Sequence, residues 1–120
     1  FSGRAYGTSK LANILFTRQL SGLLKYATTN CLHPGVVATN ITKGEGGLVG
    51  TFFTFAQRFM LTPLQGAQTL LFLCNSDSVK HVSGMYFDSC KKKTPAKHAC
   101  SDADAKKLWD WSMQQCHFLL

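Results

Sequence analysis

Tyr6-Gly7-Thr8-Ser9-Lys10-Leu11-Ala12-Asn13 is the stretch that decides the fold of this 120-residue sequence. Hydrophobic periodicity predicts a helix from about Ala5 to Leu24, so Tyr6 and Lys10, four residues apart, share one helical face. An ammonium group close to a tyrosine hydroxyl favours the phenolate, which suits acid–base chemistry near neutral pH. By spacing alone, however, an ordinary surface pair is the simpler interpretation.

Further predicted elements alternate along the chain. Residues 28–33 are partly β-branched and read as a strand that stops at Pro34-Gly35. Residues 52–61 are rich in phenylalanine and predict a short helix or lid, and residues 84–87 predict a second strand. The lysine-rich stretch that follows is expected to be a solvated loop, and a last helix begins near Ser101. This alternation predicts an α/β fold with a parallel sheet.

The third predicted helix has clear start signals. Thr62 can serve as its N-cap, Pro63 occupies the first helical position and Gln65 completes a capping box. Its buried side is expected to consist of apolar residues at helical spacing, namely Leu64, Ala67, Leu70, Leu71 and Cys74.

Two strands are too few for a stable parallel sheet. We therefore expect the missing strands to precede Phe1, and a first residue other than Met also indicates an incomplete or processed chain. The exposed edge of such a sheet would accept a partner strand.

The helix motif resembles the active-site helix of the short-chain dehydrogenase/reductase family. A second stretch, His33-Pro34-Gly35-Val36-Val37-Ala38-Thr39-Asn40, resembles the family's Pro-Gly motif at a suitable distance downstream. The retinol-dehydrogenase-like branch is similar in Val82-Ser83-Gly84-Met85-Tyr86-Phe87-Asp88, in the lysine-rich stretch with Pro95, and in Ala105-Lys106-Lys107-Leu108-Trp109. The resemblance implies that residues 1–120 are the C-terminal part of a single NAD(P)-binding Rossmann-like domain, the later half of a doubly wound parallel sheet.

The resemblance also implies a role for each matching residue. Tyr6 would be the catalytic acid/base, and Lys10 would favour its phenolate and bind the nicotinamide ribose. Pro34 and Gly35 would turn the chain beside the nicotinamide, and the backbone of Val37 would meet the carboxamide. Thr39 would hydrogen-bond near the carboxamide or the pyrophosphate. His33 is expected to be a hydrogen-bonded structural histidine, with contact to the cofactor as the alternative.

The implied function is NADP(H)-linked interconversion of alcohols and carbonyls, with NAD as the alternative cofactor and a retinoid or other lipophilic substrate. Residues 41–61 would form the substrate loop or lid, in which Phe52, Phe53 and Phe55 line an apolar pocket rather than only filling the core. The helix that carries the catalytic tyrosine often forms dimer contacts in this family, so a homodimer is one expectation that follows from the resemblance.

The sequence lacks the family's glycine-rich phosphate loop and the serine expected shortly before the tyrosine. We therefore expect the isolated chain neither to bind the dinucleotide well nor to turn over substrate. Two alternatives stay open: a truncated, non-catalytic interaction module, and a catalytically dead family member.

Composition narrows the remaining classes of partner. Part of the net charge of +7 comes from one local run of lysines, which is too narrow for a nucleic-acid interface. Attraction of this run to anionic lipid is less expected than a solvated loop but more expected than nucleic-acid binding. Five cysteines without CxxC pairs, and Cys90, His98, Cys100 and His117 at unusual spacings, predict no metal site. We expect reduced thiols and an intracellular location, in the cytoplasm or at the endoplasmic-reticulum or mitochondrial membrane, with peripheral membrane contact.

Overall fold

A computed structural model describes residues 3–37 and 60–116 of the chain. Its elements, in order, are α1 (Gly3–Leu23), β1 (Cys31–His33), α3 (Pro63–Asn75), the 3-10 turn η3 (Asp77–Val79), β2 (Tyr86–Asp88), β3 (Lys91–Lys93), the 3-10 turn η4 (Lys97–Cys100) and α4 (Asp102–Cys116). Thr39, Phe52, Phe53, Phe55 and most of the expected lid lie outside the described residues. Both predicted strands are present, but each is only three residues long.

The sheet is three-stranded, in the order β1-β2-β3. β1 and β2 are parallel, with His33 opposite Asp88, as the α/β pattern predicts. β3 is antiparallel to β2, so the expected loop at Lys91–Lys93 is wrong: these residues form an exposed edge strand. A tight turn at Ser89 and Cys90, both with positive φ (52° and 60°), directs the chain back along β2 and imposes this pairing.

Side-chain hydrogen bonds fix the parallel pair before its strands begin. Asn30 donates from its amide nitrogen to the carbonyl of Val82 at 2.7 Å, and its amide oxygen accepts from the backbone N–H of Met85 at 3.0 Å. The carbonyl of Thr29 accepts from the N–H of Gly84 at 2.7 Å. These bonds join the approaches to β1 and β2, which lie more than 50 residues apart in sequence, and so contribute to the register of the ladder.

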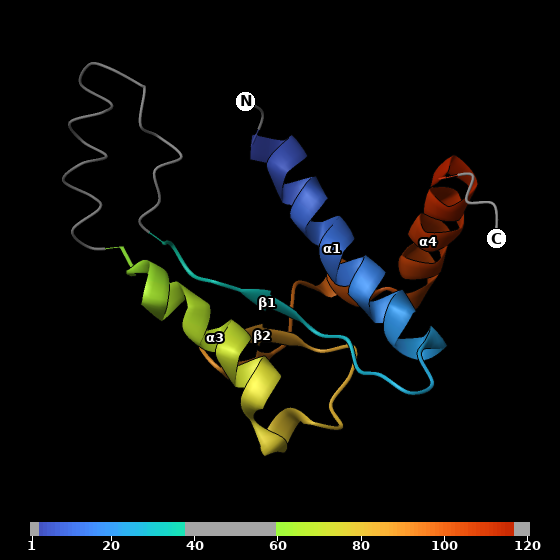
Figure 1. Ribbon diagram of the computed structural model, residues 1–120. Helices are drawn as coiled ribbons and strands as arrows, with labels where there is room; N and C mark the ends of the chain where they lie inside the picture. Colours follow the sequence, from blue (N-terminus) through green and yellow to red (C-terminus); the bar gives the residue numbers. More distant parts are fainter. Residues whose placement is uncertain (1–2, 38–59, 117–120) are drawn as a thin grey trace, which may run out of the picture.

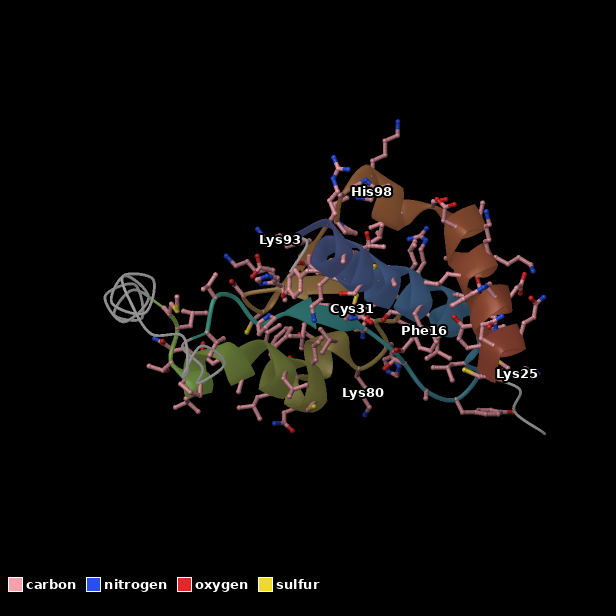
Figure 2. The ribbon with its side chains drawn as sticks, turned by 90° about the horizontal axis from the view of Figure 1, so that it is seen from above. Phe16, Lys25, Cys31, Lys80, Lys93 and His98 are labelled. Carbon is pink, nitrogen blue, oxygen red and sulfur yellow. The ribbon has the colours of Figure 1, made fainter. Side chains whose placement is uncertain are left out.

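The helices cover both faces of the sheet. Seen from above, α1 and α3 lie on opposite sides of β1, and α4 lies beside α1 (Figure 1, Figure 2). Phe72 of α3 packs on Phe87 of β2 with ring centroids 6.2 Å apart. Phe16 of α1 packs on Trp109 of α4 with ring centroids 5.1 Å apart, so Trp109 anchors α4 on α1, whereas Trp111 is 59% exposed. This layering agrees with an incomplete doubly wound α/β domain.

Helix α3 begins as the sequence predicts. The Thr62 hydroxyl accepts from the backbone N–H of Gln65 at 3.2 Å, and the Gln65 side chain accepts from the N–H of Thr62 at 2.8 Å, which is a complete capping box. The expected buried face is wrong: Leu64 and Leu70 are 71% and 53% exposed. Gly66 and Thr69 are the buried positions, because the helix packs closely against β1 and the β2–β3 turn with its small side chains.

The buried core is small. Its apolar members come from α1, η3, β2, η4 and α4: Leu15, Val79, Phe87, Ala99 and Ala105. None of the large side chains in the described parts of the chain is fully enclosed. Within those same parts, no helix has the length and apolar character needed to cross a membrane.

Candidate active site

Tyr6 and Lys10 lie on the first turns of α1 and share one face of the helix. The Lys10 ammonium lies 5.3 Å from the centroid of the Tyr6 ring, a cation–π arrangement, and the Tyr6 side chain is 54% exposed. Between them, the hydroxyls of Thr8 and Ser9 donate back to the carbonyls of Arg4 and Tyr6 at 2.9 and 2.7 Å. The small intervening residues therefore leave the tyrosine–lysine face open.

The Pro34-Gly35 turn follows β1 directly. Gly35 has a φ of +79°, and a Cβ at this position would collide with the side chain of Leu61, so the turn requires glycine. The backbone N–H of Gly35 donates to Nδ1 of His33 at 2.8 Å. His33 is therefore a hydrogen-bonded histidine, as expected from the sequence.

The backbone after this turn is held against the start of α3. The N–H of Leu61 donates to the carbonyl of Val36 at 2.9 Å, and Val37 and Leu61 form an isolated parallel β-bridge. Val37 also packs so tightly on Gly66 that a Cβ there would meet its side chain. The described segments that end at Val37 and resume before Leu61 therefore lie next to each other.

A hollow of about 200 Å³ lies beside the turn, at the carboxyl ends of β1 and β2. Ligands of open α/β sheets bind at this edge. Besides His33, Pro34, Gly35 and Leu61, its lining consists of Gln65, Gln68, Thr69, Asp88, Ser89 and Cys90. It therefore adds polar groups from α3 and the β2–β3 turn to those of the Pro-Gly motif.

Thr69 and Cys90 are residues of this hollow that sequence reasoning missed. Thr69 is 4% exposed, and its hydroxyl accepts from the N–H of Cys90 at 3.2 Å, which supports the turn in its left-handed conformation. A left-handed Ser89-Cys90 pair has no sequence signal, because such turns ordinarily contain glycine or asparagine. The threonine at position 69, next to the apolar run Leu70–Cys74, was the only available indication.

The two parts of the expected site lie at the same end of the fold. α1 runs antiparallel to β1, so the amino end of the helix and the carboxyl end of the strand point the same way (Figure 1). The hollow brings together His33, Pro34 and Gly35, whereas Tyr6 and Lys10 form a separate pair on α1. Among the described residues, no group of histidine, cysteine or acidic side chains is arranged to hold a metal ion.

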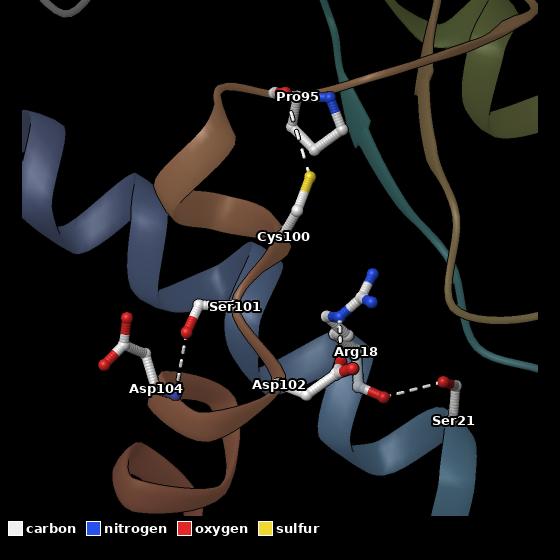
Figure 3. Close-up of polar contacts among 7 residues, drawn as sticks. All are labelled: Arg18, Ser21, Pro95, Cys100, Ser101, Asp102 and Asp104. Atoms are coloured by element: carbon white, nitrogen blue, oxygen red, sulfur yellow. Dashed lines mark hydrogen bonds and ion pairs between the residues drawn. The ribbon is translucent and has the colours of Figure 1, made fainter.

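A polar cluster in the C-terminal half of α1 joins this helix to α4 (Figure 3). Arg18 donates from Nε to the Asp102 carboxylate at 2.5 Å, and this bond lowers the pKa of Asp102 and raises that of Arg18. The Ser101 hydroxyl accepts from the N–H of Asp104 at 3.1 Å and so caps α4. Burial raises the pKa of the Cys31 thiol in the adjacent strand and of the Tyr86 hydroxyl.

Comparison with known proteins gives several curated relatives. No family model matches the chain. Human retinol dehydrogenase 14 is 44% identical over 112 residues, which are 89% of this chain and 33% of that protein. Human retinol dehydrogenase 12 is 35% identical over 114 residues (93% and 36%), and the chloroplastic short-chain dehydrogenase TIC 32 A of Brassica napus is 37% identical over 117 residues (92% and 36%). The chain spans about one third of the length of these relatives.

Proposed function

We propose, from the premise that this chain belongs to the retinol-dehydrogenase-like branch of the short-chain dehydrogenase/reductase family, that it supplies the proton-transfer part of an alcohol–carbonyl oxidoreductase. The observation that carries the proposal is the common, open face of Tyr6 and Lys10, with the ammonium 5.3 Å from the tyrosine ring. The names of the chain's relatives describe dehydrogenases, which supports interconversion of alcohols and carbonyls as the reaction class.

Tyr6 is the proposed acid/base. Its hydroxyl donates a proton to the carbonyl oxygen during reduction and accepts one from the alcohol during oxidation. Lys10, one turn away, provides a positive charge that stabilises the phenolate left after the proton has moved. Side-chain exposure at Tyr6 lets a substrate oxygen approach without rearrangement of α1.

The proposed cofactor is a nicotinamide dinucleotide, which supplies or accepts the hydride when it is bound. The polar hollow beside the Pro34-Gly35 turn, at the carboxyl ends of β1 and β2, fits its nicotinamide end. Pro34, Gly35, Val37 and Thr39 are the proposed contacts. The pyrophosphate end has no counterpart in residues 3–37 and 60–116, where no strand leads through a glycine-rich turn into a helix.

Finer assignments rest on the resemblance. NADP is proposed over NAD, and a retinoid or another lipophilic alcohol or aldehyde is proposed as substrate, in contact with Phe52, Phe53 and Phe55. Homodimerisation and peripheral membrane contact are further proposals. The relatives are not uniform in location, since one of them is chloroplastic by name.

A chimera tests the function. This chain replaces the matching third of human retinol dehydrogenase 14, and NADPH-dependent reduction of retinal is measured. Tyr6→Phe is expected to lower kcat by roughly 100-fold or more, because positioned acid catalysis contributes at least that factor. Tyr26→Phe is the matched control, since Tyr26 is fully exposed at the end of α1. Equal rates for Tyr6→Phe and the parent chimera would refute the assignment.

The isolated chain is the second arm of this experiment. It is expected to show no cofactor oxidation with retinal, because the part that binds the pyrophosphate is absent from its sequence. A folded chimera that binds NADPH but is inactive would instead favour a catalytically dead family member. The non-catalytic module has one supporting observation: among the described residues, β1 has a partner on one side only.

A further inference from the structure

We infer that His33 is a positioning residue, whose imidazole holds the Pro34-Gly35 turn in the conformation that receives the nicotinamide carboxamide. The inference rests on the proposed function. It assigns a role to the His33 side chain, which directly precedes the Pro34-Gly35 pair of the family motif. His33 itself is the last residue of β1 and is exposed. Its effect on the cofactor is therefore exerted through the backbone of Gly35.

The hydrogen-bonding inventory of the turn explains why a side chain is needed here. The β1–β2 ladder ends at His33, and Pro34 has no N–H to donate. The first free donor after the strand is the N–H of Gly35, which His33 Nδ1 accepts at 2.8 Å. Because Nδ1 is the acceptor, the neutral imidazole carries its proton on Nε2.

The bond restricts the one residue of the turn that has unusual freedom. Glycine populates many backbone conformations, and Gly35 is held at a φ of +79°. The side chain of Leu61 limits the space on one side of Gly35, and the imidazole fixes its amide on the other. Loss of the imidazole would leave a mixture of turn conformations, only some of which match the cofactor.

The neighbouring acid does not compete for this histidine. Asp88 lies opposite His33 in the parallel ladder, and both line the hollow. The Asp88 carboxylate, however, accepts from the hydroxyl of Ser89 at 2.9 Å. The imidazole accepts its hydrogen bond from the Gly35 amide, so the geometry favours support of the turn over a His–Asp proton relay.

The first test follows amide hydrogen exchange in the complete 120-residue chain by nitrogen-15 NMR. His33→Leu is expected to speed exchange at Gly35 roughly threefold to tenfold, the factor that a net hydrogen bond of this kind provides. His33→Asn should stay within about twofold of the parent, because an asparagine oxygen accepts from the N–H two residues on. His98→Leu, at an exposed histidine of η4, should have no effect at Gly35.

The Leu61 amide, which is bonded to the Val36 carbonyl, reports whether each variant still folds. If His33→Leu does not fold, His33→Gln replaces it. The glutamine side chain is longer than that of asparagine, so its oxygen is not placed to accept from the Gly35 N–H. Unchanged exchange at Gly35 in a folded Leu or Gln variant would overturn the inference and leave the proposed function standing.

The second test introduces the same substitutions into the chimera with human retinol dehydrogenase 14 and measures the affinity of each variant for NADPH by titration. His33→Leu should weaken the affinity by up to about the same threefold to tenfold, because affinity scales with the populated competent conformation. His33→Asn should restore it. Equal affinity in all variants, despite faster exchange, would overturn the positioning role. Failure of the parent chimera to bind NADPH would count against the proposed cofactor site itself.

Discussion

Among single residues, Asp102 has the clearest pH dependence. Its pKa is lowered by the hydrogen bond from Arg18, so its contribution to stability is complete above the ordinary value of 3.8 and is lost as pH falls through the lowered pKa. Asp102→Asn is expected to reduce stability slightly at pH 7, and the difference from the parent should shrink below pH 3.8. Urea unfolding between pH 7 and pH 3 measures this.

Asp77→Asn is the control for that change, because Asp77 is exposed and makes no ion pair among the described residues. A pH-independent difference at Asp102 would mean that the ionic bond to Arg18 does not account for its effect. High salt should weaken the Asp102 effect, since both partners are accessible to solvent.

At the scale of elements, the start of α3 should depend on its capping box. Thr62→Ala removes the acceptor for the Gln65 N–H and is expected to lower the free energy of unfolding by about 1 kcal/mol. Thr62→Ser should retain most of it. Thr28→Ala, at an exposed threonine in the loop after α1, is the matched control. Thermal or urea unfolding measures these differences, and equal losses at both threonines would contradict the local origin of the effect.

Local patterns made parts of the fold predictable from sequence. The capping box joins residues three apart, and Tyr6 and Lys10 are four apart, so helical geometry alone relates them. The Pro34-Gly35 turn was likewise predictable from sequence, because proline restricts the backbone, glycine gives it extra freedom, and the pair is a strong turn signal. The bonded state of His33 also followed from its place beside that turn.

Features set by tertiary context were not predictable. Three consecutive lysines have low strand propensity, and only pairing with β2 through a left-handed turn makes them β3. The ion pair between Arg18 and Asp102 spans 84 residues and has no local signal. The burial of Thr69 in place of Leu70 depends on which face of α3 meets the β2–β3 turn.

For the whole molecule, the junction of the first and last helices should be decisive. Ala105 is 1% exposed, in the helix that packs on α1, so Ala105→Leu is expected to cost about 1–3 kcal/mol of stability through overpacking. Ala103→Leu, two residues earlier on the exposed side of α4, should change stability little. Circular dichroism during urea unfolding compares them. A similar loss for both would mean that α4 does not pack as described.

The 84 residues that separate Arg18 from Asp102 also constrain biosynthesis. Helix α1 leaves the ribosome long before its partner α4 exists. At ordinary translation rates the interval is roughly 4–17 s. During this time Phe16 lacks its ring contact with Trp109 of α4. Until α4 is synthesised, this face of α1 therefore stays exposed to chaperones for seconds.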